Sequence, residues 1–244
     1  GRFPHPPEPT REHLTGLCDA VTRHGADIGF AQDPDADRLA VVDETGRYIG
    51  EEYTLALSAM HVLANEPGPA AANLSSSRML DDVAASFGSP VIRTAVGEAN
   101  VVAGMRREHA VIGGEGNGGV IWPKVVYVRD SIGGMGLLLE LLAARGEPLS
   151  KIVDAIPSYA IEKHKLPIEQ GMADSAIGIL RERYADQRID LQDGIRIDFD
   201  QAWVHVRPSN TEPILRLIAE APDEQAARQL IADVQREIEG PPDG

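Results

Sequence analysis

The chain has 244 residues, 43% of them apolar, which suffices for the cores of one large domain or two small ones. Its 38 acidic and 23 basic side chains give a formal net charge of −15, which argues against a nucleic-acid-binding or membrane-binding surface. A single cysteine, Cys18, excludes an internal disulfide framework and a cysteine-based zinc cluster. With no apolar run of spanning length and no apolar signal region, we expect a cytoplasmic protein.

Residues 1–50 are predicted to form the end of an α/β domain. They open on a proline-rich segment that is typical of the middle of a longer chain, so we expect a fragment. A helix is predicted over residues 10–24, with Thr10 as its N-cap. Two strands, at 28–32 and 39–42, are expected to pair around an acidic tip.

Residues 51–157 alternate between helical and strand patterns, which predicts βαβ units and a mostly parallel sheet. The expected helices cover residues 51–64, 79–87, 99–108, 130–144 and 148–156. The expected strands cover residues 71–75, 91–94 and 110–113.

Residues 158–244 predict a small α+β domain, in which an antiparallel sheet is covered on one face by two helices. Its strands are expected at 159–168, 194–199, 202–206 and 214–219, and its helices at 173–184 and 223–239. The predicted fold class is therefore α/β: the end of one α/β domain, a mostly parallel α/β domain, and a small antiparallel α+β domain.

The acidic tip reads Asp33-Pro34-Asp35-Ala36-Asp37-Arg38. Carboxylates at alternate positions of an extended loop can converge on one hard cation, and the lack of nitrogen or sulfur ligands favours Mg²⁺. A solvated acidic turn is the alternative. An EF-hand calcium loop fits poorly, because Arg38 stands where that loop needs glycine.

A glycine-rich segment at residues 113–119 lies after a predicted strand. Its Glu115 would repel phosphate and accept hydrogen bonds from hydroxyl groups, so a sugar diol is a natural partner, with Asn117 assisting. A glycine-rich connector without a ligand is the alternative.

A third loop reads Arg207-Pro208-Ser209-Asn210-Thr211-Glu212-Pro213 and is followed by Arg216. Guanidinium groups give bidentate charge-assisted bonds to phosphate, and hydroxyls and loop amides donate further bonds. The candidate ligands are those that can donate, namely Arg207, Ser209, Asn210, Thr211 and Arg216. A polar turn held by its own side chains is the alternative.

Together these loops resemble the metal, sugar and phosphate loops of the α-D-phosphohexomutases. The acidic loop is similar to the family's Asp-Gly-Asp-x-Asp-Arg, with Pro34 in place of the glycine. Residues 114–119 resemble Gly-Glu-x-Ser-Gly-His, with Asn117 for the serine and Gly119 for the histidine. Residues 94–97 resemble the Thr-x-Val-Gly turn. The family's phosphoserine loop has no counterpart here, so we expect the isolated chain to lack mutase activity.

The resemblance implies an intramolecular phosphotransferase (an isomerase) that moves phosphate between C1 and C6 of a hexose phosphate. It implies that Mg²⁺ is held by Asp33, Asp35 and Asp37, and that Arg38 stabilises the transferring phosphoryl group. Glu115 and Asn117 would bind sugar hydroxyls, and the arginine-bearing loop would bind the distal phosphate. The substrate is expected to be a glucosamine, mannose or glucose phosphate, with glucosamine favoured. A non-catalytic phosphosugar-binding module and a calcium-binding structural domain remain as alternatives.

Overall fold

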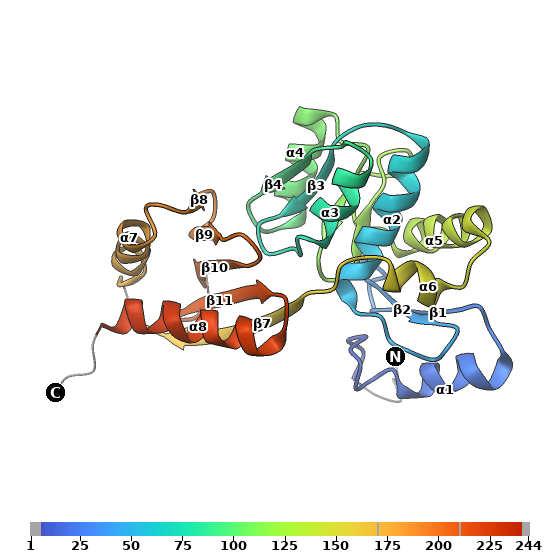
Figure 1. Ribbon diagram of the computed structural model, residues 1–244, viewed down its shortest axis with the longest axis horizontal. Coiled ribbons are helices and arrows are strands. Elements are labelled where there is room, and N and C mark those ends of the chain that lie inside the picture. Colours follow the sequence, from blue (N-terminus) through green and yellow to red (C-terminus); the bar gives the residue numbers. More distant parts are fainter. Residues whose placement is uncertain (1–5, 170, 210, 241–244) are drawn as a thin grey trace. The chain divides into compact units, whose positions relative to one another are not determined.

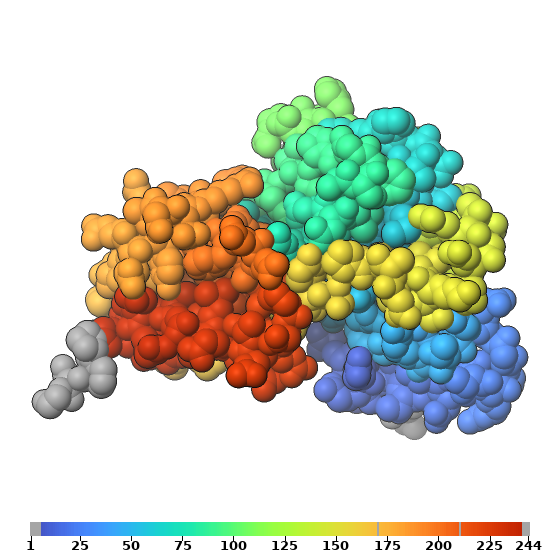
Figure 2. Space-filling view, in the orientation of Figure 1, coloured from blue at the N-terminus to red at the C-terminus, as the bar shows by residue number. Residues whose placement is uncertain are grey.

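The computed structural model describes residues 6–169, 171–209 and 211–240. It divides into two compact units, Gly1–Pro157 and Ser158–Gly244, whose elements are labelled in Figure 1. Figure 2 shows one face of the molecule in the same orientation, with the first unit coloured from blue to yellow and the second from orange to red. The predicted α/β fold class is confirmed.

The first unit begins with helix α1 (Thr15–His24). The expected N-cap at Thr10 was wrong, since the residue before the helix is Leu14. Thr10 instead belongs to a preceding turn, in which its carbonyl accepts from the His13 N–H at 3.0 Å and its hydroxyl lies 3.1 Å from His13 Nδ1. These local bonds use the groups that would otherwise start the helix.

Strands β1 (Ile28–Gln32) and β2 (Leu39–Asp43) form an antiparallel hairpin, as predicted. Ile28 pairs with Asp43 and Gln32 with Leu39, so the acidic segment is the connection between them. Every residue of β2 is buried. The hairpin therefore holds both ends of the acidic loop on a fixed base.

A four-stranded sheet follows, in the order β4-β3-β5-β6. Strands β3 (Ala70–Asn73), β4 (Val91–Thr94) and β5 (Ile112–Glu115) are parallel, and β6 (Gly119–Ile121) runs antiparallel to β5.

Strand β5 lies two residues later than expected, and β6 was not predicted. The cause is close packing. A Cβ on Gly113 would lie 2.5 Å from Met105 Sδ and 3.0 Å from the Ala71 carbonyl oxygen, so the glycine belongs to the strand and not to the loop.

Helices α2 (Glu51–Asn65), α3 (Met79–Ser86), α4 (Glu98–Glu108) and α5 (Ser131–Arg145) pack against this sheet. Helix α6 (Leu149–Asp154) follows α5 in the chain. Helix α2 packs against α3, α5 and β5. Buried leucines of α2 and α5, among them Leu55 and Leu138, remove apolar area from water at the centre of the unit.

The second unit is a five-stranded antiparallel sheet in the order β7-β11-β10-β9-β8. Its strands are β7 (Ala160–Pro167), β8 (Arg188–Asp190), β9 (Ile195–Asp198), β10 (Trp203–Pro208) and β11 (Ile214–Ala221). Helices α7 (Ala173–Arg183) and α8 (Glu224–Glu239) share one core with the strand residues of a single face, as expected. Strand β8 was missed because it has only three residues, of which Arg188 is exposed.

Among the described residues, no helix is both long and apolar enough to cross a membrane.

Helix α5 begins at a side-chain cap that offers a stability test. Asp130 accepts from the Ile132 N–H at 3.0 Å and the Gly133 N–H at 3.2 Å. We expect Asp130→Ala to lower the free energy of unfolding by about 1 kcal/mol, because two helix N–H groups lose their partner. Asp130→Asn retains a cap acceptor and should stay closer to wild type. Urea unfolding of the three proteins measures the difference, and equal losses in both variants would contradict a capping role.

Candidate functional site

The acidic loop brings three carboxylates together at the tip of the β1–β2 hairpin. One oxygen each from Asp33, Asp35 and Asp37 lies within 4.8 Å of the others. Asp35 is exposed, and Asp33 and Asp37 are half-buried. A set of three carboxylate oxygens, with no nitrogen or sulfur among them, has the donor chemistry of a site for a hard divalent cation.

The backbone of this loop is held by its own side chains and by helix α5. Asp33 Oδ1 accepts from the backbone N–H groups of Asp37 at 3.1 Å and Arg38 at 3.0 Å. Ala36 adopts a left-handed conformation with φ of 60°. Its carbonyl accepts from the Ser131 N–H at 3.2 Å and the Ser131 hydroxyl at 2.7 Å. The loop is thereby anchored to the first residue of α5.

The crowding of these carboxylates separates their proton affinities. Burial raises the pKa of Asp37 to about 6, with a further rise from the hydrogen bond and the negative charge of Asp33. Burial also acts to raise the pKa of Asp33, but the hydrogen bond from the Arg38 backbone and those with the neighbouring carboxyls outweigh it, so that pKa lies below its usual value. The two close carboxyls therefore behave as a pair: Asp33 loses its proton first, and its negative charge helps Asp37 to keep a proton to higher pH.

Arg38 lies beside the acidic cluster. Its Nε is 3.7 Å from Asp33 Oδ2 and 3.8 Å from Asp37 Oδ1, and its Nη1 is 3.6 Å from Glu8 Oε1. The Nε atom is buried without a hydrogen bond of good geometry among the described residues. Long ion pairs of this kind leave the guanidinium able to donate to an anion held at the loop.

The glycine-rich segment is the tight turn of the β5–β6 hairpin. Gly118 has φ of 86°, and a Cβ there would lie 2.6 Å from the Leu39 carbonyl oxygen, so only glycine fits. The Gly118 carbonyl accepts from the Leu39 N–H at 3.0 Å. Leu39 directly follows the acidic loop. The two predicted ligand loops of the first unit are therefore joined by a backbone hydrogen bond.

Glu115 ends strand β5 and is 6% exposed. Its Oε1 accepts from Asn73 Nδ2 at 2.8 Å and from the Gly97 N–H at 3.2 Å, while its Oε2 accepts from Arg129 Nη1 at 2.8 Å. A carboxylate has about four acceptor positions, so the three protein donors fix the group and leave it the capacity to accept one further hydrogen bond.

Asn117 is partly committed to the turn itself. Its Oδ1 accepts from the Gly119 N–H at 3.2 Å. For the side-chain oxygen, this local bond agrees with the alternative that the segment is a connector without a ligand. The side-chain NH₂ has no protein acceptor within the described residues and can donate to a ligand.

Arg129 was missed by the sequence analysis. Its guanidinium donates to Asp37 of the acidic loop, to Glu115 at 2.8 Å and to Glu98 Oε2 at 3.1 Å. Its backbone N–H also donates to Glu98, at 3.0 Å. A single arginine after an exposed apolar stretch carries no local signal, since its partners are 92, 14 and 31 positions away.

Ser76 was also missed by the sequence analysis. It is buried, and its hydroxyl accepts from the Gly116 N–H at 3.0 Å. Through this bond the loop after β3 supports the glycine-rich turn.

In the second unit, Arg207 is the penultimate residue of strand β10 and Arg216 lies on β11. The register pairs Arg207 directly with Arg216, and Arg216 directly with Lys165 of β7. Arg207 Nε lies 3.2 Å from Asp193 Oδ2, and Lys165 Nζ lies 3.8 Å from Glu212 Oε2. Adjacent like charges on one face of a sheet repel, which favours an anion beside them.

The loop between these strands is short and polar. The Ser209 N–H donates to the Ile214 carbonyl at 3.0 Å, and the hydroxyls of Ser209 and Thr211 lie 3.4 Å apart. Both residues line a cavity with Pro208 and Glu212. Asn210 lies outside the described residues. The two described hydroxyls are thus displayed at the same end of the sheet as the paired arginines.

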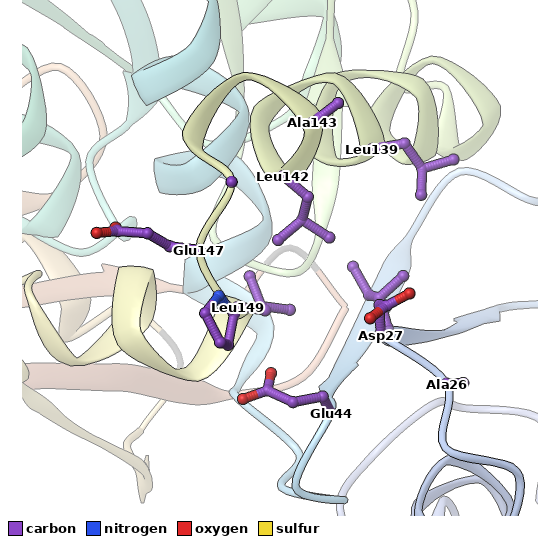
Figure 3. A pocket seen from close by; sticks show the side chains of 11 residues that line it. Ala26, Asp27, Glu44, Leu139, Leu142, Ala143, Glu147 and Leu149 are labelled. Atoms are coloured by element: carbon purple, nitrogen blue, oxygen red, sulfur yellow. The ribbon is translucent and has the colours of Figure 1, made fainter.

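A further cavity of the first unit contains none of the predicted ligand residues. Figure 3 shows the leucine side chains that line it, Leu139, Leu142 and Leu149, with carboxylates around them. One of those, Glu44, accepts from the Ser150 N–H at 3.1 Å and so caps the start of α6. Capping of α6 thus accounts for Glu44, one of the carboxylates that line this cavity.

The three sequence models of one family match this chain in succession. Residues 1–46 match phosphoglucomutase/phosphomannomutase alpha/beta/alpha domain II, residues 50–159 match alpha/beta/alpha domain III, and residues 165–237 match the C-terminal domain. The chain belongs to the phosphoglucomutase/phosphomannomutase family. The resemblance recognised from the three loops is confirmed.

Named relatives agree with this membership. A protein of Methanopyrus kandleri named probable phosphoglucosamine mutase is 39% identical over 236 residues, covering 94% of this chain and 52% of its own length. A Thermococcus kodakarensis protein named phosphoglucomutase/phosphomannomutase is 40% identical over 235 residues, covering 95% and 51%. This phosphohexomutase-family chain therefore spans about half the length of the curated relatives it matches.

Solved structures place the fold in the same family. A phosphoglucomutase/phosphomannomutase family protein from Burkholderia thailandensis matches 96% of this chain and 51% of its own, with a TM-score of 0.83 and 27% identity. The Aspergillus fumigatus N-acetylphosphoglucosamine mutase, solved with GlcNAc-6P and magnesium, matches 86% and 48%, with a TM-score of 0.60 and 18% identity. The latter likeness concerns the fold alone.

The raised pKa of Asp37 predicts a pH-dependent stability difference. Because the folded-state pKa of about 6 exceeds the ordinary value of 3.8, ionisation of Asp37 disfavours folding as the pH rises through 6. Asp37→Asn, which imitates the neutral acid, should therefore have a higher Tm than wild type at pH 8, and the difference should vanish near pH 4. Thermal unfolding followed by circular dichroism across this range measures it.

Asp43 provides the matched control for that experiment. Burial acts to raise its pKa, but the hydrogen bonds from Thr45 and Arg47 outweigh it and the pKa is lowered. Its stabilising contribution is present above pH 3.8 and is lost as the pH falls. Asp43→Asn should therefore be less stable than wild type at pH 8. If both variants shifted in the same direction at pH 8, the assignment for Asp37 would be contradicted.

Proposed function

We propose that this chain supplies the metal, sugar and distal-phosphate sites of a phosphohexomutase, which moves phosphate between C1 and C6 of a hexose phosphate. The observation that carries the proposal is the acidic loop hydrogen-bonded to the glycine-rich turn at Leu39 and Gly118. The paired arginines of the second unit add an anion site on the same chain. Metal, hydroxyl-binding and phosphate-binding chemistry are the three parts that this reaction needs.

We propose Mg²⁺ as the ion of the acidic loop, held by Asp33, Asp35 and Asp37. Three carboxylate oxygens within 4.8 Å fit a small hard cation that keeps water or a phosphate oxygen in its other positions. When bound, the ion supplies charge neutralisation for a transferring phosphoryl group.

The roles of the neighbouring side chains follow from their positions. Arg38, beside the acidic cluster, would donate to the oxygens of the transferring phosphoryl group. Glu115 would accept from sugar hydroxyls and the Asn117 NH₂ would donate to them, so that the ring is oriented by fixed groups. Arg207, Ser209, Asn210, Thr211 and Arg216 would bind the phosphate that does not react.

The proposed substrate is a glucosamine phosphate, with mannose and glucose phosphates as the alternatives. The relative named probable phosphoglucosamine mutase and the relative named phosphoglucomutase/phosphomannomutase are similarly close to this chain, at 39% and 40% identity. All three sugars present a diol to Glu115 and a phosphate to the arginines, so the same two loops serve each of them.

The phosphate assignment predicts a selective loss of affinity. Arg207→Ala and Arg216→Ala should each weaken glucosamine 6-phosphate binding by about 1.5–3 kcal/mol, because a charge-assisted hydrogen bond is lost. Mg²⁺ affinity should not change, since the acidic loop belongs to the other unit. Calorimetric titration with each ligand measures both quantities, and unchanged sugar-phosphate affinity in both variants would sink the proposed function.

The assignment of the acidic loop as a metal site predicts a variant that loses Mg²⁺ affinity without losing its fold. Asp35→Asn should weaken Mg²⁺ binding while the protein stays folded, because Asp35 is exposed and contributes little to packing. In the wild type, Mg²⁺ affinity should fall as the pH drops below about 6 and a proton occupies Asp37.

Titration with Mg²⁺ and with Ca²⁺ at pH 5 and pH 8 provides the check on this assignment. Equal Mg²⁺ affinity in wild type and Asp35→Asn would make the loop a solvated turn. A strong preference for Ca²⁺ would favour a structural calcium domain instead.

A further inference from the structure

Strand β7 contributes a cation to the face on which the two arginines lie. In the antiparallel register, Lys165 of β7 is the direct partner of Arg216, which is itself the direct partner of Arg207. The three strands β7, β11 and β10 are consecutive in the sheet (Figure 1). Directly opposed residues point to the same face, with Cβ atoms about 5 Å apart. Three cationic side chains therefore form one row across three strands.

The carboxylates near this row do not match its charge. Asp193 lies 3.2 Å from Arg207 and Glu212 lies 3.8 Å from Lys165, at the two ends of the row. Arg216, in the middle, has no carboxylate within ion-pair distance in the described part of the chain. Like charges directly opposite each other destabilise a sheet, so this row lowers the stability of the folded unit unless an anion lies over it.

We propose that Lys165 is the third cation of the phosphate site and interacts with the sugar phosphate together with Arg207 and Arg216. This inference rests on the proposed function of the arginine-bearing loop. An ammonium group is a point charge on a flexible stem, and it complements the directional forks of the two arginines. A phosphate monoester carries nearly two negative charges at neutral pH, which suits a row with an excess of positive charge.

The alternative explanation is that Lys165 protects an edge strand. Strand β7 is at the end of the sheet, and lysines on edge strands oppose pairing with another chain. Lys163 tests this directly, because it lies two residues earlier on the same strand and face but is opposite Ile218 instead of an arginine. Edge protection makes the two lysines equivalent, whereas a phosphate site distinguishes them.

The experiment is a calorimetric titration of the full chain with glucosamine 6-phosphate at low and moderate salt. Lys165→Gln should weaken binding by about fivefold and flatten its salt dependence, because one screened attraction is lost. Lys163→Gln should change affinity by less than about twofold, and Lys165→Arg should restore most of the binding. The side chain of Lys165 is 67% exposed, so the fold should persist, which circular dichroism checks.

Each result bears on a separate claim. If Lys165→Gln and Lys163→Gln have equal effects while Arg207→Ala and Arg216→Ala weaken binding, Lys165 is an edge lysine and the proposed function stands. If neither arginine variant weakens binding, the proposed function fails and the role of Lys165 fails with it.

Discussion

The first unit depends on holding several carboxylates close together against their mutual repulsion. Asp33 and Asp37 face each other at the tip of one hairpin, and Glu98 and Glu115 approach from two other elements. Arg129 resolves the conflict, since its guanidinium donates to Asp37, Glu98 and Glu115. A planar guanidinium with five N–H donors in a fixed fork can donate to three separate carboxylates at once.

This arginine also fixes which loops are neighbours. The hairpin tip, the start of α4 and the end of β5 are distant in sequence, and each contributes one carboxylate to the same guanidinium. Backbone groups join the same elements: the Leu39–Gly118 hydrogen bond connects the acidic loop to the glycine-rich turn, and the Ser131–Ala36 bonds connect it to α5. The proposed metal and sugar groups are therefore set by rigid elements and not by the loops alone.

The elements were predictable where one local pattern decided them, and the site was predictable only in part. Strands β1 and β4 begin and end at the predicted residues, because alternation and flanking turn residues act locally. Strand β5 lies two residues later than predicted because Gly113 packs against Met105, a contact that no local pattern encodes. Motifs located Asp33, Glu115 and Arg207, but the partners that orient Glu115, such as Asn73, come from other strands. Long-range pairing is what a single sequence conceals.

Several departures of this chain from the rules of stable folding lie at the acidic loop and at the row of cations on the antiparallel sheet. Ala36 adopts a left-handed conformation that costs roughly 1–2 kcal/mol for a residue with a Cβ. The pKa of Asp37 is raised by burial and by the neighbouring Asp33, so its ionised form is disfavoured in the folded protein. Arg207 and Arg216 are opposed in a sheet although like charges there repel. A sequence selected for stability alone would place glycine, asparagine and an opposite charge at such positions. Their concentration at the acidic loop and at the arginine row is what ligand binding requires, because groups held in an unfavourable arrangement gain most when a cation or a phosphate arrives.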